Sequence, residues 1–188
     1  MLRGGAGTSL HGTPKTSELC AHLSRGPGRT SGHRGPGRRR GAQPAGGDPG
    51  SSPEKVPYRT SLAKSFEVGT VLRIRGVVPK NADRFYINLL CSDEPDSEIV
   101  LHFNPRLDES SVVFNTMECS AWGSEERGGS PAFQRGEPFE LHLIAKKESF
   151  KVVVGDSDYH QFSYRLPPER ALWMEVGGDV QLELVKVF

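Results

Sequence analysis

The sequence predicts an all-β protein, a sandwich of two antiparallel sheets. Two observations carry this prediction. Apolar residues recur at every second position in short runs, as expected where one face of a strand is buried and the other faces water. Gly, Pro, Asn and Asp separate these runs at close intervals, and no window shows a long repeat of 3.6 residues. Short strands with turns at this spacing are typical of β-sandwiches.

The strands can be placed in order along the chain. Residues 70–77 alternate, with Leu72 and Ile74 on one face and Arg73 and Arg75 on the other. Further strands are expected at residues 84–90, 99–106, 111–115, 139–145, 150–154, 159–164, 171–176 and 180–188. Turns or loops are expected at residues 79–81, 91–97, 135–138, 166–170 and 177–179.

The chain divides by composition into a disordered tail over residues 1–55 and a folded domain over residues 56–188. The tail is rich in Gly, Pro, Arg and Ser and has almost no aromatic or β-branched residues, so it cannot bury enough apolar surface to offset the entropy of ordering. Residues 1–50 hold eight Lys/Arg against two acidic residues, a balance of +6. The remainder holds 16 basic and 21 acidic residues, a balance of −5.

The motif RGPGR occurs twice in the tail, at residues 25–29 and 34–38. One interpretation is an arm that binds RNA or another polyanion through its phosphates. A targeting peptide and an arbitrary extension are alternatives, and a solvated tail without a partner is the favoured interpretation. The tail has no apolar stretch of the length that a secretory signal needs, so no signal peptide is expected.

The stretch over residues 101–127 carries the chemistry. His102, Asn104 and Arg106 alternate with Leu101 and Phe103. Successive side chains of a strand point to opposite faces, so the three polar groups project from one side. A strand with an imidazole, an amide and a guanidinium on one face forms a hydrogen-bonding surface.

Asn115, Trp122, Glu125 and Arg127 follow in the same stretch. Donors, acceptors, an aromatic plate and a carboxylate that can brace arginines suit a sugar, which offers hydroxyl groups and a flat patch of C–H groups. Each residue alone has an ordinary explanation as a surface histidine, a turn residue, a core indole or a solvated charge. Those separate explanations do not account for all of these residues occurring together at this spacing.

The runs HFNPR, VFN and WGSEER resemble the galectins, the β-galactoside-binding lectins, whose pattern is H-x-N-x-R, V-x-N and W-x-x-E-x-R. The resemblance extends through GTVLRIRGVVP, RFYINLLC, FQRGEPFEL and VGGDVQLELVKVF and covers about residues 58–188. It does not include the tail. It implies that the sandwich is jelly-roll-like.

The resemblance also implies a role for each site residue. His102, Asn104 and Arg106 are expected to bind the galactose 4-hydroxyl, whose axial direction distinguishes galactose from glucose. Asn115 is expected to bind the 6-hydroxyl, and Trp122 to stack on the ring. Glu125 is expected to accept a hydrogen bond from a hydroxyl of the neighbouring sugar and to fix Arg106 and Arg127. Arg84 is expected to form a wall of the groove.

Partners and location are expected from the same resemblance. Binding is expected to need no metal and no cofactor, and the polar set around His102 lacks the carboxylate cluster of a calcium lectin. The partners expected are β-galactoside glycans and glycoproteins, which a homodimer would cross-link to affect epithelial adhesion, growth or apoptosis. We expect no membrane insertion, and a cytoplasmic and nuclear location together with non-classical secretion. Cys20, Cys91 and Cys119 cannot form a complete disulfide framework.

Two other classes of function, a glycoside hydrolase and a nucleic-acid-binding protein, fit the sequence less well than a lectin. A glycoside hydrolase needs two carboxyl groups, one of them kept protonated, but arginines near Glu125 favour its ionised form. No GxSxG motif or Cys–His nucleophile signature is present, so no enzyme is expected. A nucleic-acid-binding protein would have a basic folded domain, whereas residues beyond the tail are acidic overall.

Overall fold

The structure, a computed structural model, describes residues 54–129 and 132–188. The predicted tail over residues 1–55 therefore lies outside the described residues, apart from Glu54 and Lys55. The backbone N–H of Glu54 donates to the carbonyl oxygen of Leu182 at 2.9 Å, so this residue already pairs with the sandwich.

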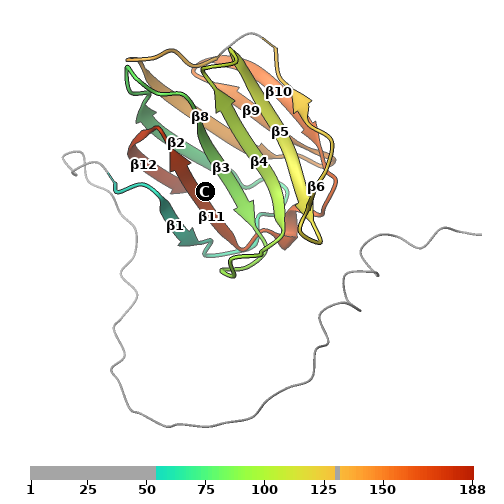
Figure 1. The fold of residues 1–188 in the computed structure, drawn as a ribbon. Coiled ribbons are helices and arrows are strands. Elements are labelled where there is room, and N and C mark those ends of the chain that lie inside the picture. Colours follow the sequence, from blue (N-terminus) through green and yellow to red (C-terminus); the bar gives the residue numbers. More distant parts are fainter. Residues whose placement is uncertain (1–53, 130–131) are drawn as a thin grey trace, which may run out of the picture. The chain divides into compact units, whose positions relative to one another are not determined.

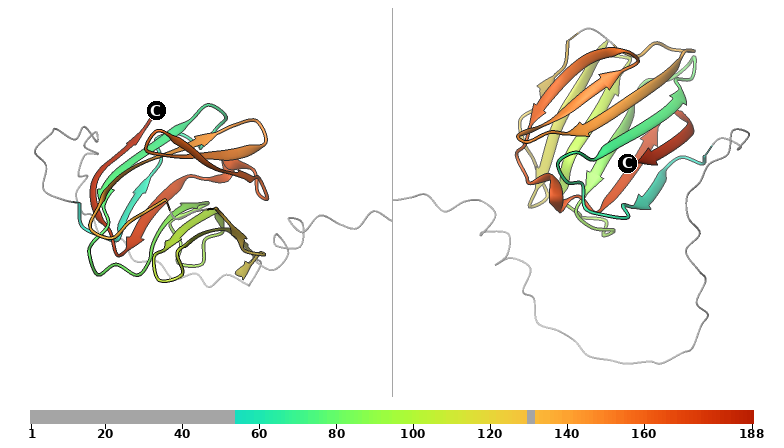
Figure 2. Two further views of the ribbon diagram at one scale, coloured as in Figure 1. Left: turned by 90° about the horizontal axis from the view of Figure 1, so that it is seen from above. Right: turned by 180° about the vertical axis from the view of Figure 1, so that it is seen from behind.

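The described residues form two sheets in which every strand pairing is antiparallel (Figure 1). The seven-stranded sheet has the order β1 (Tyr58–Ser61), β11 (Trp173–Gly178), β3 (Phe85–Leu90), β4 (Ile99–Arg106), β5 (Ser111–Glu118) and β6 (Ala121–Trp122), and β7 (Glu126–Arg127) also pairs with β5. The five-stranded sheet has the order β10 (Ser157–Ser163), β9 (Ser149–Val154), β8 (Pro138–Ala145), β2 (Val71–Val77) and β12 (Gln181–Val187). Figure 2 shows the two sheets as separate layers. The predicted two-sheet antiparallel sandwich is confirmed.

Most strand positions agree with the sequence prediction, and β4 has the predicted bounds. The strands β1, β6 and β7 were not predicted, and a short 3-10 helix, η1 (Pro168–Arg170), occupies the predicted 166–170 connection. No helix in the described part of the chain is long and apolar enough to cross a membrane.

The predicted turn at residues 177–179 was wrong for its two glycines. Gly177 and Gly178 are the last residues of β11 and pair with Tyr86 and Phe85 of β3. The ring of Tyr86 lies where a side chain on Gly177 would have to be. The glycine therefore serves the close approach of an aromatic ring rather than a change of chain direction.

The core lies between the sheets and follows from the alternation of each strand. Leu72 and Ile74 of β2 are fully buried. Leu101 and Phe103 of β4 are also buried, with at most 1% of either residue exposed. The rings of Phe103 and Phe114 are 5.3 Å apart, in an edge-to-face arrangement that aromatic pairs prefer. Burial of one face of β4 and β5 leaves the other face of both strands free to carry polar side chains.

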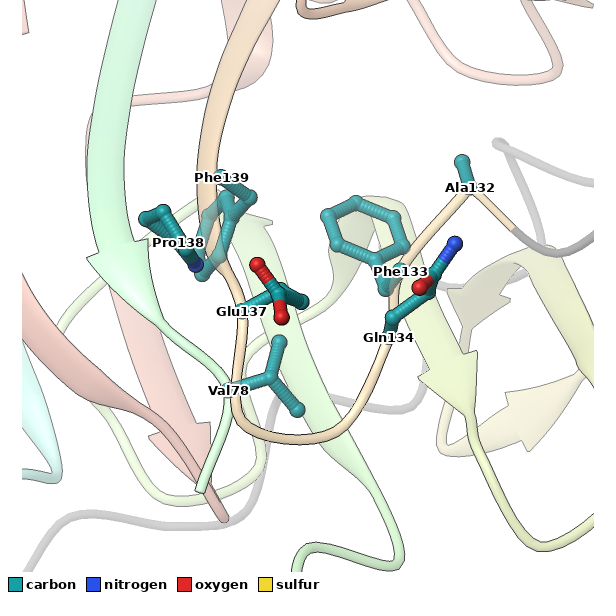
Figure 3. A pocket seen from close by; sticks show the side chains of 7 residues that line it. All are labelled: Val78, Ala132, Phe133, Gln134, Glu137, Pro138 and Phe139. Carbon is teal, nitrogen blue, oxygen red and sulfur yellow. The ribbon is translucent and has the colours of Figure 1, made fainter. Parts of the chain in front are cut away.

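The segment before β8 contributes Phe133 to this core. Phe133 packs edge-on against Phe85 and Phe139, with ring centroids 5.2 and 5.3 Å away. Next to it lies a hollow of about 250 Å³, whose lining includes Val78 and Glu137 (Figure 3). The residues that line this hollow are not those that line the groove described below.

The buried aromatic residues are expected to dominate stability. Phe150→Ala should lower the free energy of unfolding by about 3–5 kcal/mol, because Phe150 is fully buried and packs against Phe66 and Tyr164. Phe188→Ala is the matched control, since that ring is 60% exposed, and it should cost less than about 1 kcal/mol. Urea unfolding of both variants measures the difference. Equal losses at the two positions would contradict the placement of the core.

Candidate functional site

A groove of about 360 Å³ lies on the face of the seven-stranded sheet that is turned away from the core. Strands β4, β5 and β6 and the segment after β6 contribute its lining: His102, Arg106, Val113, Asn115, Trp122, Gly123 and Glu125. Five of the eight residues predicted from the sequence to bind a ligand therefore line one cavity. Of the other three, Asn104 is hydrogen-bonded to Arg106 and Arg127 to Glu125, whereas Arg84 pairs with Asp108 and Glu109, outside the lining.

The register of β4 and β5 brings the polar residues of the two strands together. His102 lies opposite Asn115, and Asn104 lies opposite Val113. Residues directly opposite in an antiparallel pair share a face of the sheet. Phe103 and Phe114 point into the core. Because side chains alternate along each strand, their neighbours His102 and Asn115 point to the groove.

His102 is held as a neutral imidazole. Its Nδ1 lies 2.6 Å from Oδ1 of Asn88, a carbonyl oxygen that can only accept, so Nδ1 carries the proton. Burial lowers the pKa of His102 to about 4. Its Nε2 therefore carries a lone pair at neutral pH, and the residue offers the groove an acceptor.

Arg106 is fixed by acceptors on several sides, and its side chain is only 16% exposed. Its Nε donates to Oδ1 of Asn104 at 2.8 Å, and Nη2 donates to Glu125 at 2.7 Å. The amide nitrogen of Asn104 in turn donates to the carbonyl oxygen of Phe85 at 2.7 Å. The buried amide thus anchors the guanidinium to the backbone of β3.

Glu125 bridges the two arginines that the sequence analysis assigned to it. Its Oε1 accepts from Arg106, and its Oε2 accepts from Nη2 of Arg127 at 3.0 Å. The hydrogen bond from Arg106 holds the pKa of Glu125 below its usual value. Glu125 is thus an ionised acceptor in the groove.

Glu109 is a second bridge, and it was not predicted from the sequence. It accepts from Arg84, Arg106 and Arg127 at 2.9, 3.3 and 2.8 Å. The hydrogen bond from Arg127 lowers the pKa of Glu109, and that from Arg84 lowers the pKa of Asp108. Glu109 lies in the turn between β4 and β5, where no periodic pattern marks a residue as functional.

Trp122 stands at the edge of the groove and is 52% exposed, which places its indole outside the core as expected. Its ring centroid is 4.9 Å from that of His102. Trp122 pairs with Met117 of β5 through the short strand β6. A large ring left open to water beside neutral and charged polar groups is suited to cover an apolar patch of a polar ligand.

Asn115 is held by residues from three places in the sequence. Its amide nitrogen donates to the carbonyl oxygen of Gly123 at 2.8 Å. Its Oδ1 accepts from the backbone N–H of Thr116 at 2.8 Å and from Nη1 of Arg165 at 3.0 Å. Arg165 was missed by the sequence analysis, because no local pattern connects a residue after β10 with one on β5.

The carboxylates of the groove suit binding rather than acid catalysis. A hydrolase acid must stay protonated, whereas Glu109 and Glu125 are held ionised by arginines. Across residues 54–129 and 132–188, no group of three His, Cys, Asp or Glu side chains is arranged to hold a metal ion.

Sequence comparison finds relatives over the same part of the chain. A model of the family described as "Galactoside-binding lectin" matches residues 57–187. Human galectin-7 is 57% identical over 133 residues, which cover 71% of this chain and 98% of that protein. Human galectin-4 is 37% identical over 131 residues, 69% of this chain and 41% of that protein.

Solved structures of galectins share the fold. A variant of human galectin-16 superposes with a TM-score of 0.69 at 29% identity, covering 73% of this chain and 99% of that one. Sheep galectin-11 in complex with glycerol superposes with a TM-score of 0.65 at 26% identity, covering 70% and 97%. The family match, the relatives and the groove built by His102, Arg106 and Trp122 agree, and the chain belongs to the galectins, the family of galactoside-binding lectins.

Proposed function

We propose that this lectin binds β-galactoside glycans in the groove. One observation carries the proposal: three complementary groups line the same groove. His102 supplies a neutral acceptor, Arg106 supplies N–H donors held in place by Glu125, and Trp122 supplies an exposed aromatic ring. Membership of a lectin family makes the activity binding rather than catalysis.

In the proposed complex the 4-hydroxyl of galactose donates to Nε2 of His102 and accepts from Arg106, and Asn104 contributes its second amide hydrogen. An axial hydroxyl reaches these groups from above the sugar ring, whereas the equatorial 4-hydroxyl of glucose points along the ring plane. The ring's apolar face then lies against Trp122, and the 6-hydroxyl lies against Asn115.

The neighbouring sugar occupies the end of the groove beyond Arg106. Glu125 accepts from one of its hydroxyls while it holds Arg106 and Arg127. Arg84, held by Asp108 and Glu109, forms the outer wall.

A shallow site of this kind binds a small polar ligand weakly, with dissociation constants on the order of millimolar to tens of micromolar. Useful strength then requires multivalency. We propose a homodimer that cross-links glycoproteins, and with it an effect on the adhesion, growth or apoptosis of epithelial cells. The cytoplasm, the nucleus and the cell exterior are the locations that go with this function. We assign sugar binding to residues 56–188, and residues 1–55 contribute nothing to it.

The role of the indole can be tested by substitution. Trp122→Ala should abolish measurable lactose binding while the fold persists, because the ring is exposed and stacking on a ring contributes about 1–3 kcal/mol. Trp173→Ala is the matched control, since Trp173 lies on β11 and does not line the groove. Calorimetric titration with lactose, together with thermal unfolding, measures both. Unchanged binding by the folded Trp122 variant would refute the proposed site.

The low pKa of His102 predicts how lactose binding depends on pH. The sugar hydroxyl needs neutral His102 as its acceptor, so affinity falls as the pH drops through the pKa, which is about 4 in the free protein. We expect nearly constant affinity from pH ~8 to ~5 and a steep loss below pH ~4. A midpoint near the ordinary imidazole value of about 6.5 would contradict the neutral acceptor.

Folding must be monitored in the same pH series. The unfolded chain takes up a proton on His102 before the folded protein does, so this residue lowers stability as the pH falls from about 6.5 to 4. Circular dichroism at each pH separates loss of the fold from loss of the acceptor.

The homodimer is a separate prediction. Both sheets end in edge strands, β1 and β6 in one and β10 and β12 in the other, and such edges are commonly covered or paired. Sedimentation equilibrium of the full chain at high micromolar concentration should give twice the chain mass of 20.6 kDa. A monomeric mass under these conditions would remove the cross-linking mechanism and leave the sugar site intact.

A further inference from the structure

Arg165 connects two parts of the groove from outside it. The residue follows β10, a strand of the five-stranded sheet, while Asn115 lies on β5 of the other sheet. Its Nη1 donates to Oδ1 of Asn115 at 3.0 Å and to the carbonyl oxygen of Ser124 at 2.7 Å. One guanidinium nitrogen therefore holds both a groove side chain and the segment after Trp122.

These contacts settle the orientation of the Asn115 amide. A guanidinium and a backbone N–H can only donate, so the atom that faces Arg165 and Thr116 must be the carbonyl oxygen. Both lone pairs of that oxygen are then in use. Of the two amide hydrogens, one is taken by the carbonyl oxygen of Gly123. Asn115 has one N–H left for a ligand, and it can act there only as a donor.

Arg165 is itself held in place by its surroundings. Its guanidinium carbon lies 4.8 Å from the ring centroid of Phe162, and Nη2 lies 3.8 Å from Glu126. Glu126 also contacts Nε2 of His160 at 2.7 Å. The guanidinium therefore packs on the ring of Phe162 and lies beside the carboxylate of Glu126, and both contacts keep it directed at Asn115.

The backbone beside Asn115 is shaped around the same contact. A side chain added at Gly123 would come within 3.0 Å of Nη1 of Arg165 and 3.1 Å of Oδ1 of Asn115. The N–H of Gly123 also donates to the carbonyl oxygen of Thr116 at 2.9 Å. Gly123 thus leaves the space through which Arg165 reaches the amide.

We propose that Arg165 is a positioning residue for sugar specificity: it holds Asn115 in the single orientation that presents an N–H to the hydroxymethyl group of galactose. The inference rests on the proposed function, since it assigns that hydroxyl to Asn115. It adds that recognition of the 6-hydroxyl is lost when Arg165 is lost, although Arg165 does not touch the sugar.

The test compares lactose with 6′-deoxylactose, in which the galactose lacks the 6-hydroxyl. One hydrogen bond corresponds to a preference of about tenfold for lactose in the wild-type chain. Arg165→Met should weaken lactose binding by about tenfold and leave 6′-deoxylactose binding within about twofold, so the preference disappears. Arg135→Met is the matched control, because Arg135 also donates to a backbone carbonyl, that of Ala82, and does not line the groove.

A double-mutant cycle with Asn115→Ala separates positioning from general support. If Arg165 acts through the amide, Arg165→Met has no further effect on the preference in the Asn115→Ala chain. Equal weakening of both sugars by Arg165→Met, with the preference kept, would overturn the inference. So would a wild-type chain that binds the two sugars equally. A wild-type chain that binds neither sugar would refute the proposed function itself.

Discussion

The groove depends on one electrostatic constraint, the burial of the Arg106 guanidinium. A charge whose side chain is only 16% exposed must be matched by acceptors, because an unpaired buried charge is strongly destabilising. Glu125 and Glu109 provide the carboxylates, and they come from separate segments: the stretch before β7 and the turn after β4. Pairing with Arg106 therefore brings both segments to the same end of the groove, and Arg84 and Arg127 join through the same two carboxylates.

This network also sets the charge that a ligand meets. Arg84, Arg106 and Arg127 are balanced by Asp108, Glu109 and Glu125, all in ion pairs with them. The individual donors and acceptors form strong hydrogen bonds because they are charged. The net charge of the six groups is zero, so the network attracts neither anions nor cations over a distance. Such a surface suits an uncharged ligand that both donates and accepts, and its affinity for one should depend little on salt.

Much of the site could be predicted from the sequence, because its central residues obey a local rule. The period of two in β4 places His102, Asn104 and Arg106 on one face whatever the rest of the chain does. The motif spacing and the family resemblance supplied Trp122 and Glu125. Glu109 and Arg165 could not be found in this way, since their partners are set by how a turn and a second sheet come to lie beside β5. The strands β6 and β7 were missed because two residues show no period, and Gly177 was misread because its constraint is a ring on another strand.

The exposure of Trp122 has an optical consequence. The chain has two tryptophans, and the other, Trp173, is half-buried on β11 away from the groove. An indole in water emits at a longer wavelength than one that is covered, so a sugar lying on Trp122 moves its emission toward the blue. The contribution of Trp173 stays constant during such a titration. If sugar binds as proposed, the protein carries an intrinsic fluorescent reporter at that surface, and occupancy can be followed without a label.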